Sequence, residues 1–178
     1  MEKKDCIKIA VIGAESTGKS TLCADLALHY HTVFVKEYAR EYFNEHDINN
    51  YTINDIDFIY RKQIEEEKKA ISYANRLLFC DTALITGKIW SEEVFKQCSP
   101  FVLENIFKNH YDYYLVTDND LPWVADLQRK NSYNRNDLLS KHLVWLKSNK
   151  LPYSIVFGQG EKRLNSAIGE IDTFFNTK

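Results

Sequence analysis

The stretch Gly13-Ala14-Glu15-Ser16-Thr17-Gly18-Lys19-Ser20 directly follows the apolar run Ile7–Ile12 and precedes a segment with Leu22, Leu26 and Tyr30 at helical spacing. A strand, a glycine-rich loop and a helix in this order form the context in which Gly-x4-Gly-Lys-Ser binds phosphate. The glycines let the backbone curl around a phosphate group, and N–H groups of the loop and the helix N-terminus donate to its oxygens. The stretch therefore predicts a phosphate-binding loop for a nucleoside triphosphate.

The chemistry of the loop assigns roles to two side chains. We expect Lys19 to reach the β- and γ-phosphates of ATP and the Ser20 hydroxyl to bind Mg²⁺. Glu15 and Ser16 occupy variable positions of the motif, so their side chains receive no role. The predicted nucleotide-binding residues of this region are Gly13, Glu15, Ser16, Thr17, Gly18, Lys19, Ser20 and Thr21.

Composition limits the class of protein. With 178 residues, 44% of them hydrophobic, the chain fits one domain, and residues 1–178 show no linker or repeat. A formal net charge of −2 gives no general attraction for nucleic acid or for an anionic membrane. No run approaches the ~20 apolar residues of a membrane span, and the N-terminus lacks the apolar core of a signal peptide. We expect a cytoplasmic protein with four reduced cysteines; its oligomeric state stays open.

Alternation of apolar runs with longer amphipathic stretches predicts the fold. Such alternation is typical of a parallel sheet with helical crossovers. We therefore expect a three-layer α/β fold with a five-stranded parallel sheet. The predicted strands are Ile7–Ile12, Val33–Lys36, Leu77–Cys80, Tyr113–Thr117 and Tyr153–Phe157.

Two local patterns lie between the second and third predicted strands. Thr52 and Asp55 have the spacing of a capping box, which predicts a helix start. That helix continues past Arg61 into Glu65–Lys69, a charged run whose acid-to-base spacing predicts a solvated face.

Other phosphate-loop proteins carry signatures that are missing here. A guanine-binding switch needs Asn-Lys-x-Asp, whereas Asn149-Lys150-Leu151-Pro152 lacks the acid. Asp81 is followed by Thr82-Ala83-Leu84, so the Asp-x-x-Gly of such switches is absent, as is the Asp-Glu pair of ring ATPases. A small-molecule kinase fits the sequence better.

A kinase also needs a carboxylate at the acceptor, a metal ligand and cations over the transferred group. Glu37 follows the second strand and is placed to accept the acceptor's proton or to orient its hydroxyl. Asp81 ends the third strand and is placed to hold Mg²⁺. Arg40, Arg129 and Arg135 are the candidate cations, the last two within a polar stretch, 119–136, that resembles a closing lid.

Four segments occur together in a recognisable order. They are Gly13–Leu22, Glu37-Tyr38-Ala39-Arg40-Glu41-Tyr42, Phe79-Cys80-Asp81-Thr82 and Leu121–Arg129. In this order they resemble the NadR-like ATPase family, which includes the ribosylnicotinamide kinase domain of bifunctional NAD-biosynthesis proteins. The similarity covers nearly the whole chain, as expected for that kinase module standing alone.

The resemblance implies a nucleoside-kinase-like fold that phosphorylates nicotinamide riboside to nicotinamide mononucleotide with ATP. It implies that Glu37, Arg40 and Asp81 line the acceptor and metal site, and that Trp123 and Arg129 belong to the lid. Which of the two carboxylates is the base stays open.

One position departs from the pattern of the family, in which an aromatic residue precedes the Glu-Tyr pair; here Lys36 stands there. Ring stacking would then come from Tyr38, Tyr42 or Tyr60. Three functions remain in view: a nicotinamide riboside kinase, a kinase for another nucleoside or vitamin, and an ATP-dependent regulatory switch.

Overall fold

A single parallel sheet organises the computed structural model, which describes residues 6–125, 127–128 and 134–176. The strand order is β2-β3-β1-β4-β5, and each neighbouring pair is parallel. The five strands are β1 (Ile7–Ile12), β2 (Val33–Val35), β3 (Leu77–Asp81), β4 (Tyr113–Thr117) and β5 (Tyr153–Val156). The predicted fold class is confirmed, and each predicted strand is present with its ends within one residue.

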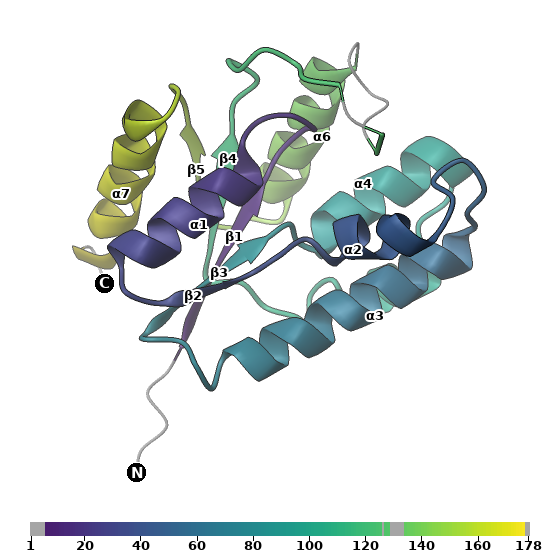
Figure 1. Ribbon diagram of the computed structural model, residues 1–178, viewed down its shortest axis with the longest axis horizontal. Helices are drawn as coiled ribbons and strands as arrows, with labels where there is room; N and C mark the ends of the chain where they lie inside the picture. Colours follow the sequence, from purple (N-terminus) through teal and green to yellow (C-terminus); the bar gives the residue numbers. More distant parts are fainter. Residues whose placement is uncertain (1–5, 126, 129–133, 177–178) are drawn as a thin grey trace.

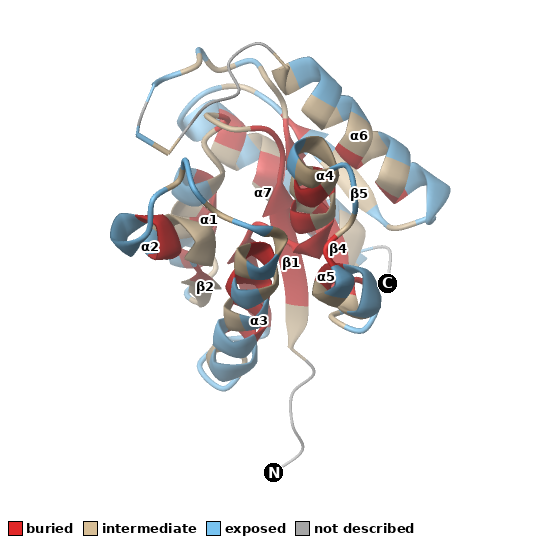
Figure 2. Ribbon diagram, turned by 90° about the vertical axis from the view of Figure 1, so that its right-hand side faces the viewer, coloured by how far each residue is buried: buried red, intermediate tan, exposed pale blue. Residues whose placement is uncertain are grey.

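Helices cover both faces of this sheet (Figure 1). They are α1 (Lys19–His29), α2 (Tyr38–Glu45), α3 (Ile53–Ala70), α4 (Leu84–Phe95), α5 (Pro100–Asn105), α6 (Arg135–Ser148) and α7 (Glu161–Asn176). One face packs against α1 and α7, the other against α3, α4, α5 and α6. Each face of the sheet carries a hydrophobic core, and alternate residues of β1 pack into the two cores. Ile9 and Val11 pack on one side, and Ala10 and Ile12 pack on the other. β3 and β4 are consequently buried over their whole length, and β1 is buried from Lys8 onward (Figure 2).

The strand order brings distant segments to one edge of the sheet. The chain runs from β1 to β2 and β3 on one side, then crosses to β4 and β5 on the other. In open α/β sheets, ligands bind where the order changes direction, beyond the carboxyl ends of the strands. At that edge β1 leads into the glycine-rich loop, β2 into Glu37, and β3 ends on Asp81.

The helix α3 confirms one prediction and corrects another. The Thr52 capping box is present, with the Thr52 N–H 2.7 Å from the Asp55 carboxylate. The charged run is only partly solvated, because Glu67 is fully buried. Its carboxylate lies 2.7 Å from the Lys8 ammonium at the start of β1. Sequence spacing alone puts Glu67 among charges, but helical geometry puts it on the inward face with Gln63 and Ile64.

Two further expectations concern membranes and thiols. Among the described residues, no helix combines the length and the apolar character needed to cross a membrane. All four cysteines are free thiols, as expected.

Candidate functional site

The phosphate loop is held tightly against the end of β4. Gly13 has φ 144°, and a Cβ there would lie 2.4 Å from Thr117 Oγ1, so only glycine fits. Thr17 Oγ1 lies 2.6 Å from Thr117 Oγ1 and 2.8 Å from the Ala14 carbonyl oxygen, to which it donates. Gly18 adopts the left-handed conformation, φ 75°, and caps α1. The loop is therefore preshaped, with the N-terminus of α1 facing its ligand side.

Lys19 lies across this loop. Its ammonium donates to the carbonyl oxygens of Gly13 and Ala14, at 3.1 and 2.8 Å. All the predicted loop residues border one cavity of about 380 Å³: Gly13, Glu15, Ser16, Thr17, Gly18, Lys19, Ser20 and Thr21. A cation and a ring of backbone donors at one end of a cavity make a suitable phosphate site.

Asp81 and Ser20 meet beside the loop, as predicted. Asp81 is 1% exposed, and the Ser20 hydroxyl and the Glu37 backbone N–H lie near its carboxylate. Burial raises the pKa of the Asp81 carboxyl, while the nearby Lys19 cation and the Ser20 hydroxyl oppose that rise. Within the described ranges, its Oδ1 atom is buried without a hydrogen-bond partner.

These two side chains fit the predicted metal. Hydroxyl and carboxylate oxygens are ligands that Mg²⁺ prefers, and an unpaired buried carboxylate oxygen suits a cation. The structure's described residues contain no group of three or more His, Cys, Asp or Glu arranged for metal binding. Mg²⁺ usually keeps several waters and takes further ligands from substrate phosphates, so it needs only one or two protein ligands.

Glu37 and Arg40 stand opposite the loop, at the start of α2. The Arg40 Nε atom lies 3.7 Å from the Glu37 carboxylate, and both side chains border the cavity. Burial raises the pKa of the Glu37 carboxyl; Lys19 and Arg40 lower it, and Asp81 raises it further. The turn before α2 is fixed by the buried Gln63, whose amide oxygen accepts from the Tyr38 N–H at 2.9 Å. The predicted carboxylates and cation are thus brought together.

The far end of the cavity is aromatic. Phe43 from α2, Tyr51 from the following loop and Trp90 from α4 line it, together with Tyr60. The Trp90 Nε1 donates to the Tyr51 hydroxyl at 2.8 Å, and the Phe43 and Tyr51 rings are 5.4 Å apart. We call Phe43, Tyr51 and Trp90 the aromatic wall. The volume lies within the range of small-molecule sites, roughly 300–1,000 Å³.

The structure places the three predicted stacking residues in different surroundings. Of the three, only Tyr60 borders this cavity; Tyr42 stacks on His46, with ring centroids 3.9 Å apart. Tyr38 and Lys36 line a second hollow, which shares Ser20, Glu37 and Arg40 with this cavity. Members of the aromatic wall are spread over 48 positions of the chain, from Phe43 to Trp90. No local spacing could have revealed them.

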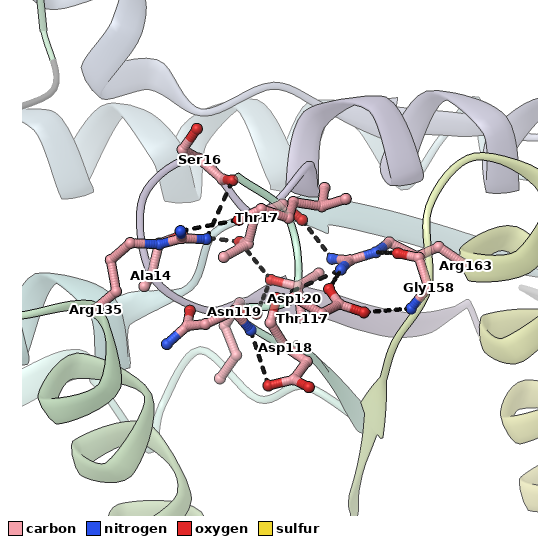
Figure 3. Close-up of polar contacts among 12 residues, drawn as sticks. Ala14, Ser16, Thr17, Thr117, Asp118, Asn119, Asp120, Arg135, Gly158 and Arg163 are labelled. Atoms are coloured by element: carbon pink, nitrogen blue, oxygen red, sulfur yellow. Dashed lines mark hydrogen bonds and ion pairs between the residues drawn. The ribbon is translucent and has the colours of Figure 1, made fainter. Parts of the chain in front are cut away.

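The predicted lid, residues 119–136, is partly described. Arg129 lies outside the described residues. Arg135 begins α6, and its guanidinium donates to the Leu121 carbonyl at 2.9 Å and to the Ser16 carbonyl at 3.4 Å (Figure 3). The Val124 N–H donates to the Ser16 hydroxyl at 2.8 Å. Both described flanks of the stretch therefore contact the phosphate loop.

Sequence reasoning missed Arg163, near the start of α7. It is 3% exposed, and its guanidinium donates to the carbonyl oxygens of Thr17 and Gly158 and pairs with the Asp120 carboxylate. Figure 3 shows this side chain joining the phosphate loop to the loops after β4 and β5. The same network holds Gly158 after β5, whose carbonyl oxygen accepts from Arg163 and whose N–H donates to the Asp120 carboxylate. A lone arginine in a polar stretch carries no motif that could have identified it.

The strand, loop and helix arrangement, with the loop at the carboxyl edge of a five-stranded parallel sheet, defines a P-loop nucleotide-binding fold of the nucleoside-kinase type. Residues 8–163 match the family model described as "AAA domain", and the chain belongs to that family.

The chain is also similar to curated proteins. It is 31% identical over 150 residues to the trifunctional NAD biosynthesis/regulator protein NadR of Salmonella typhimurium, and 30% identical to that of Escherichia coli. Each match covers 82% of this chain and 37% of the relative, so the chain spans well under half the length of these relatives. The predicted resemblance to the NadR-like family is confirmed.

Solved structures share the fold. A NadR protein in complex with NAD and AMP-PNP superposes with a TM-score of 0.79 at 24% identity, over 99% of this chain and 51% of that chain. A NadR protein in complex with NR gives 0.80 at 23% identity, over 96% and 51%. The deoxyadenosine kinase of M. mycoides gives 0.59 at 13% identity, over 94% and 100%.

Proposed function

We propose that this protein is a kinase that transfers the γ-phosphoryl group of ATP to a hydroxyl of a nucleoside, with nicotinamide riboside as the preferred acceptor. One observation carries the proposal. Lys19, Ser20 and Glu37 border the same cavity as the aromatic wall. The phosphate loop and the aromatic wall thus border one space, as a phosphoryl transfer between two bound ligands requires.

The residues divide the work as follows. The loop N–H groups and Lys19 bind the phosphates and stabilise charge on the transferred group. Ser20 and Asp81 would hold Mg²⁺, which supplies charge neutralisation at the β- and γ-phosphates when bound. Glu37 accepts a hydrogen bond from the acceptor hydroxyl and orients it toward the phosphate loop. Arg40 stands beside Glu37 as a further cation, and Arg129 and Arg135 are proposed to approach the phosphates from the lid.

The aromatic end favours a planar cationic ring. Glu15 borders the same cavity as the aromatic wall. Burial raises the pKa of the Tyr51 hydroxyl, the hydrogen bond from Trp90 opposes that rise, and the negative charge of Glu15 adds to it. A pyridinium ring would gain both from π faces and from a nearby carboxylate. Lys36 does not border this cavity, so it presents no like charge to such a ring. The NadR structure in complex with NR supports the same acceptor.

The test is ADP formation from Mg-ATP with nicotinamide riboside, other nucleosides, thiamine or no acceptor. Selective stimulation by nicotinamide riboside is the expected result. Stimulation by another acceptor would replace the substrate within the same enzyme class. Slow hydrolysis that no acceptor changes would refute the kinase and favour an ATP-dependent switch.

Lys19→Ala should abolish acceptor-dependent ADP formation, since it removes the cation of the phosphate loop. Lys108→Ala is the matched control, because Lys108 is an exposed lysine paired with Glu104 on the surface. Activity retained in Lys19→Ala would overturn the assignment.

A further inference from the structure

Two polar side chains of the cavity wall form a pair that the proposed mechanism does not use. His142 of α6 is 2% exposed, and its Nδ1 atom lies 2.8 Å from the Leu138 carbonyl oxygen. Its Nε2 atom lies 3.1 Å from Oγ1 of Thr86, which is half-buried in the first turn of α4. Both residues border the cavity that holds the phosphate loop and the aromatic wall. The two residues are 56 positions apart in the chain.

These contacts determine which group donates and which accepts in each hydrogen bond of His142. A carbonyl oxygen only accepts, so the Leu138 contact requires the proton on Nδ1 of His142. Burial lowers the pKa of His142 to about 4, so the ring is neutral at neutral pH and Nε2 carries a lone pair. The hydroxyl of Thr86 must therefore donate its proton to Nε2. A hydroxyl has one proton and two lone pairs, so the Thr86 hydroxyl can still accept hydrogen bonds but has no further proton to donate.

We propose that Thr86 is a specificity-determining residue, which accepts a hydrogen bond from a neutral donor on the acceptor substrate, and that His142 is the positioning residue that holds the Thr86 proton away from that donor. The inference rests on the proposed function only for the nucleoside class of the acceptor. Nicotinamide riboside offers two kinds of neutral donor, the sugar hydroxyls and the carboxamide N–H.

The position of Thr86 favours the sugar hydroxyl. Along α4 the cavity is lined by Thr86, then Trp90 and Val94, each one helical turn further from the end of β3. The ring belongs with Trp90, and the reacting hydroxyl belongs near Glu37. Thr86 lies one helical turn before Trp90 and borders the same cavity as Glu37, so it is available to the sugar that joins the ring to the reacting hydroxyl.

The experiment compares kcat/KM for nicotinamide riboside, its 2′-deoxy and 3′-deoxy analogues, and nicotinic acid riboside, whose carboxylate replaces the amide. Wild-type protein should prefer the substrate that bears the recognised donor by about tenfold, the worth of one neutral hydrogen bond. Thr86→Val removes the acceptor without changing the side-chain shape and should abolish that preference. Thr86→Ser keeps the hydroxyl and should retain it. Loss of a 2′- or 3′-deoxy penalty identifies a sugar hydroxyl; loss of the amide preference identifies the carboxamide.

A second variant tests the role of His142. His142→Leu leaves no orphaned carbonyl, because Leu138 is inside α6, and should weaken the same preference by freeing the Thr86 proton. The double variant Thr86→Val/His142→Leu should be no less selective than Thr86→Val alone, since His142 acts through Thr86. KM for ATP and thermal unfolding serve as controls for the fold.

The outcomes separate the two claims. If Thr86→Val lowers kcat/KM equally for every acceptor, or leaves each preference intact, Thr86 does not accept a hydrogen bond from the substrate. This inference would then be refuted, while the proposed kinase function would stand. If the wild-type protein shows no stimulation and no calorimetric binding with any riboside, the proposed function and this inference fail together.

Discussion

A buried ion pair at the edge of the sheet opposite the phosphate loop gives the sharpest test of the packing. Lys8 Nζ lies 2.7 Å from the Glu67 carboxylate, donates to Asn109 Oδ1 at 2.8 Å, and lies 4.3 Å from the centroid of the Tyr111 ring. Glu67 also accepts from the Tyr111 hydroxyl at 2.7 Å and from the Asn109 amide at 2.9 Å. Lys8→Met would leave the Glu67 charge uncompensated in the core. A change of this kind costs about 3–5 kcal/mol, a large part of the 5–15 kcal/mol typical of a domain.

The assay is equilibrium unfolding in urea, with stability obtained by linear extrapolation. Lys8→Met should lower the midpoint strongly with an unchanged slope. Lys8→Met/Glu67→Gln should recover most of the loss, because the amide carries no charge and its oxygen still accepts from Tyr111. Lys108→Met, which breaks an exposed pair, should cause no measurable change.

Two results would refute this reasoning. A loss below about 1 kcal/mol in Lys8→Met would mean that Glu67 is hydrated or neutral in the folded protein. A double variant no more stable than Lys8→Met would show that packing of the lysine stem, rather than charge compensation, stabilises this region.

Further predictions concern the cavity. A Cβ at Gly87 would lie 2.4 Å from the Tyr60 ring, so Gly87→Ala should cost about 1–3 kcal/mol in thermal unfolding and raise KM for the acceptor; an unchanged KM would mean that Tyr60 does not shape the acceptor site. Burial raises the pKa of both Glu37 and Asp81, and Arg40 lowers both. If these carboxylates act ionised, the acid limb of kcat/KM against pH should lie above the ordinary carboxyl range, and Arg40→Gln should move it to still higher pH. A shift to lower pH would contradict the placement of Arg40.

Much of this molecule could be predicted from local sequence. The apolar runs located the five strands of the described sheet. The signal is strongest in β3 and β4, because strands buried on both faces are apolar over most of their length. The phosphate loop can be identified directly from the sequence, because phosphate binding needs its glycines and Lys19 at a fixed spacing. Glu37 and Asp81 could be paired in advance, because carboxyl ends of parallel strands meet at one edge of the sheet.

Other parts depended on how the elements pack. From the sequence, Glu67 is predicted to be one more surface charge, but α3 directs its side chain toward Lys8. A solvated side chain is likewise expected for Arg163, but in the structure it contacts three loops. The aromatic wall, like the pair of Thr86 and His142, joins side chains whose separation in the chain follows no period. Sequence alone therefore determined the elements, the phosphate loop and the edge of the sheet where the ligands meet. Only the tertiary structure decided which side chains close the acceptor cavity, because helix rotation and strand order, rather than local spacing, bring those residues into contact.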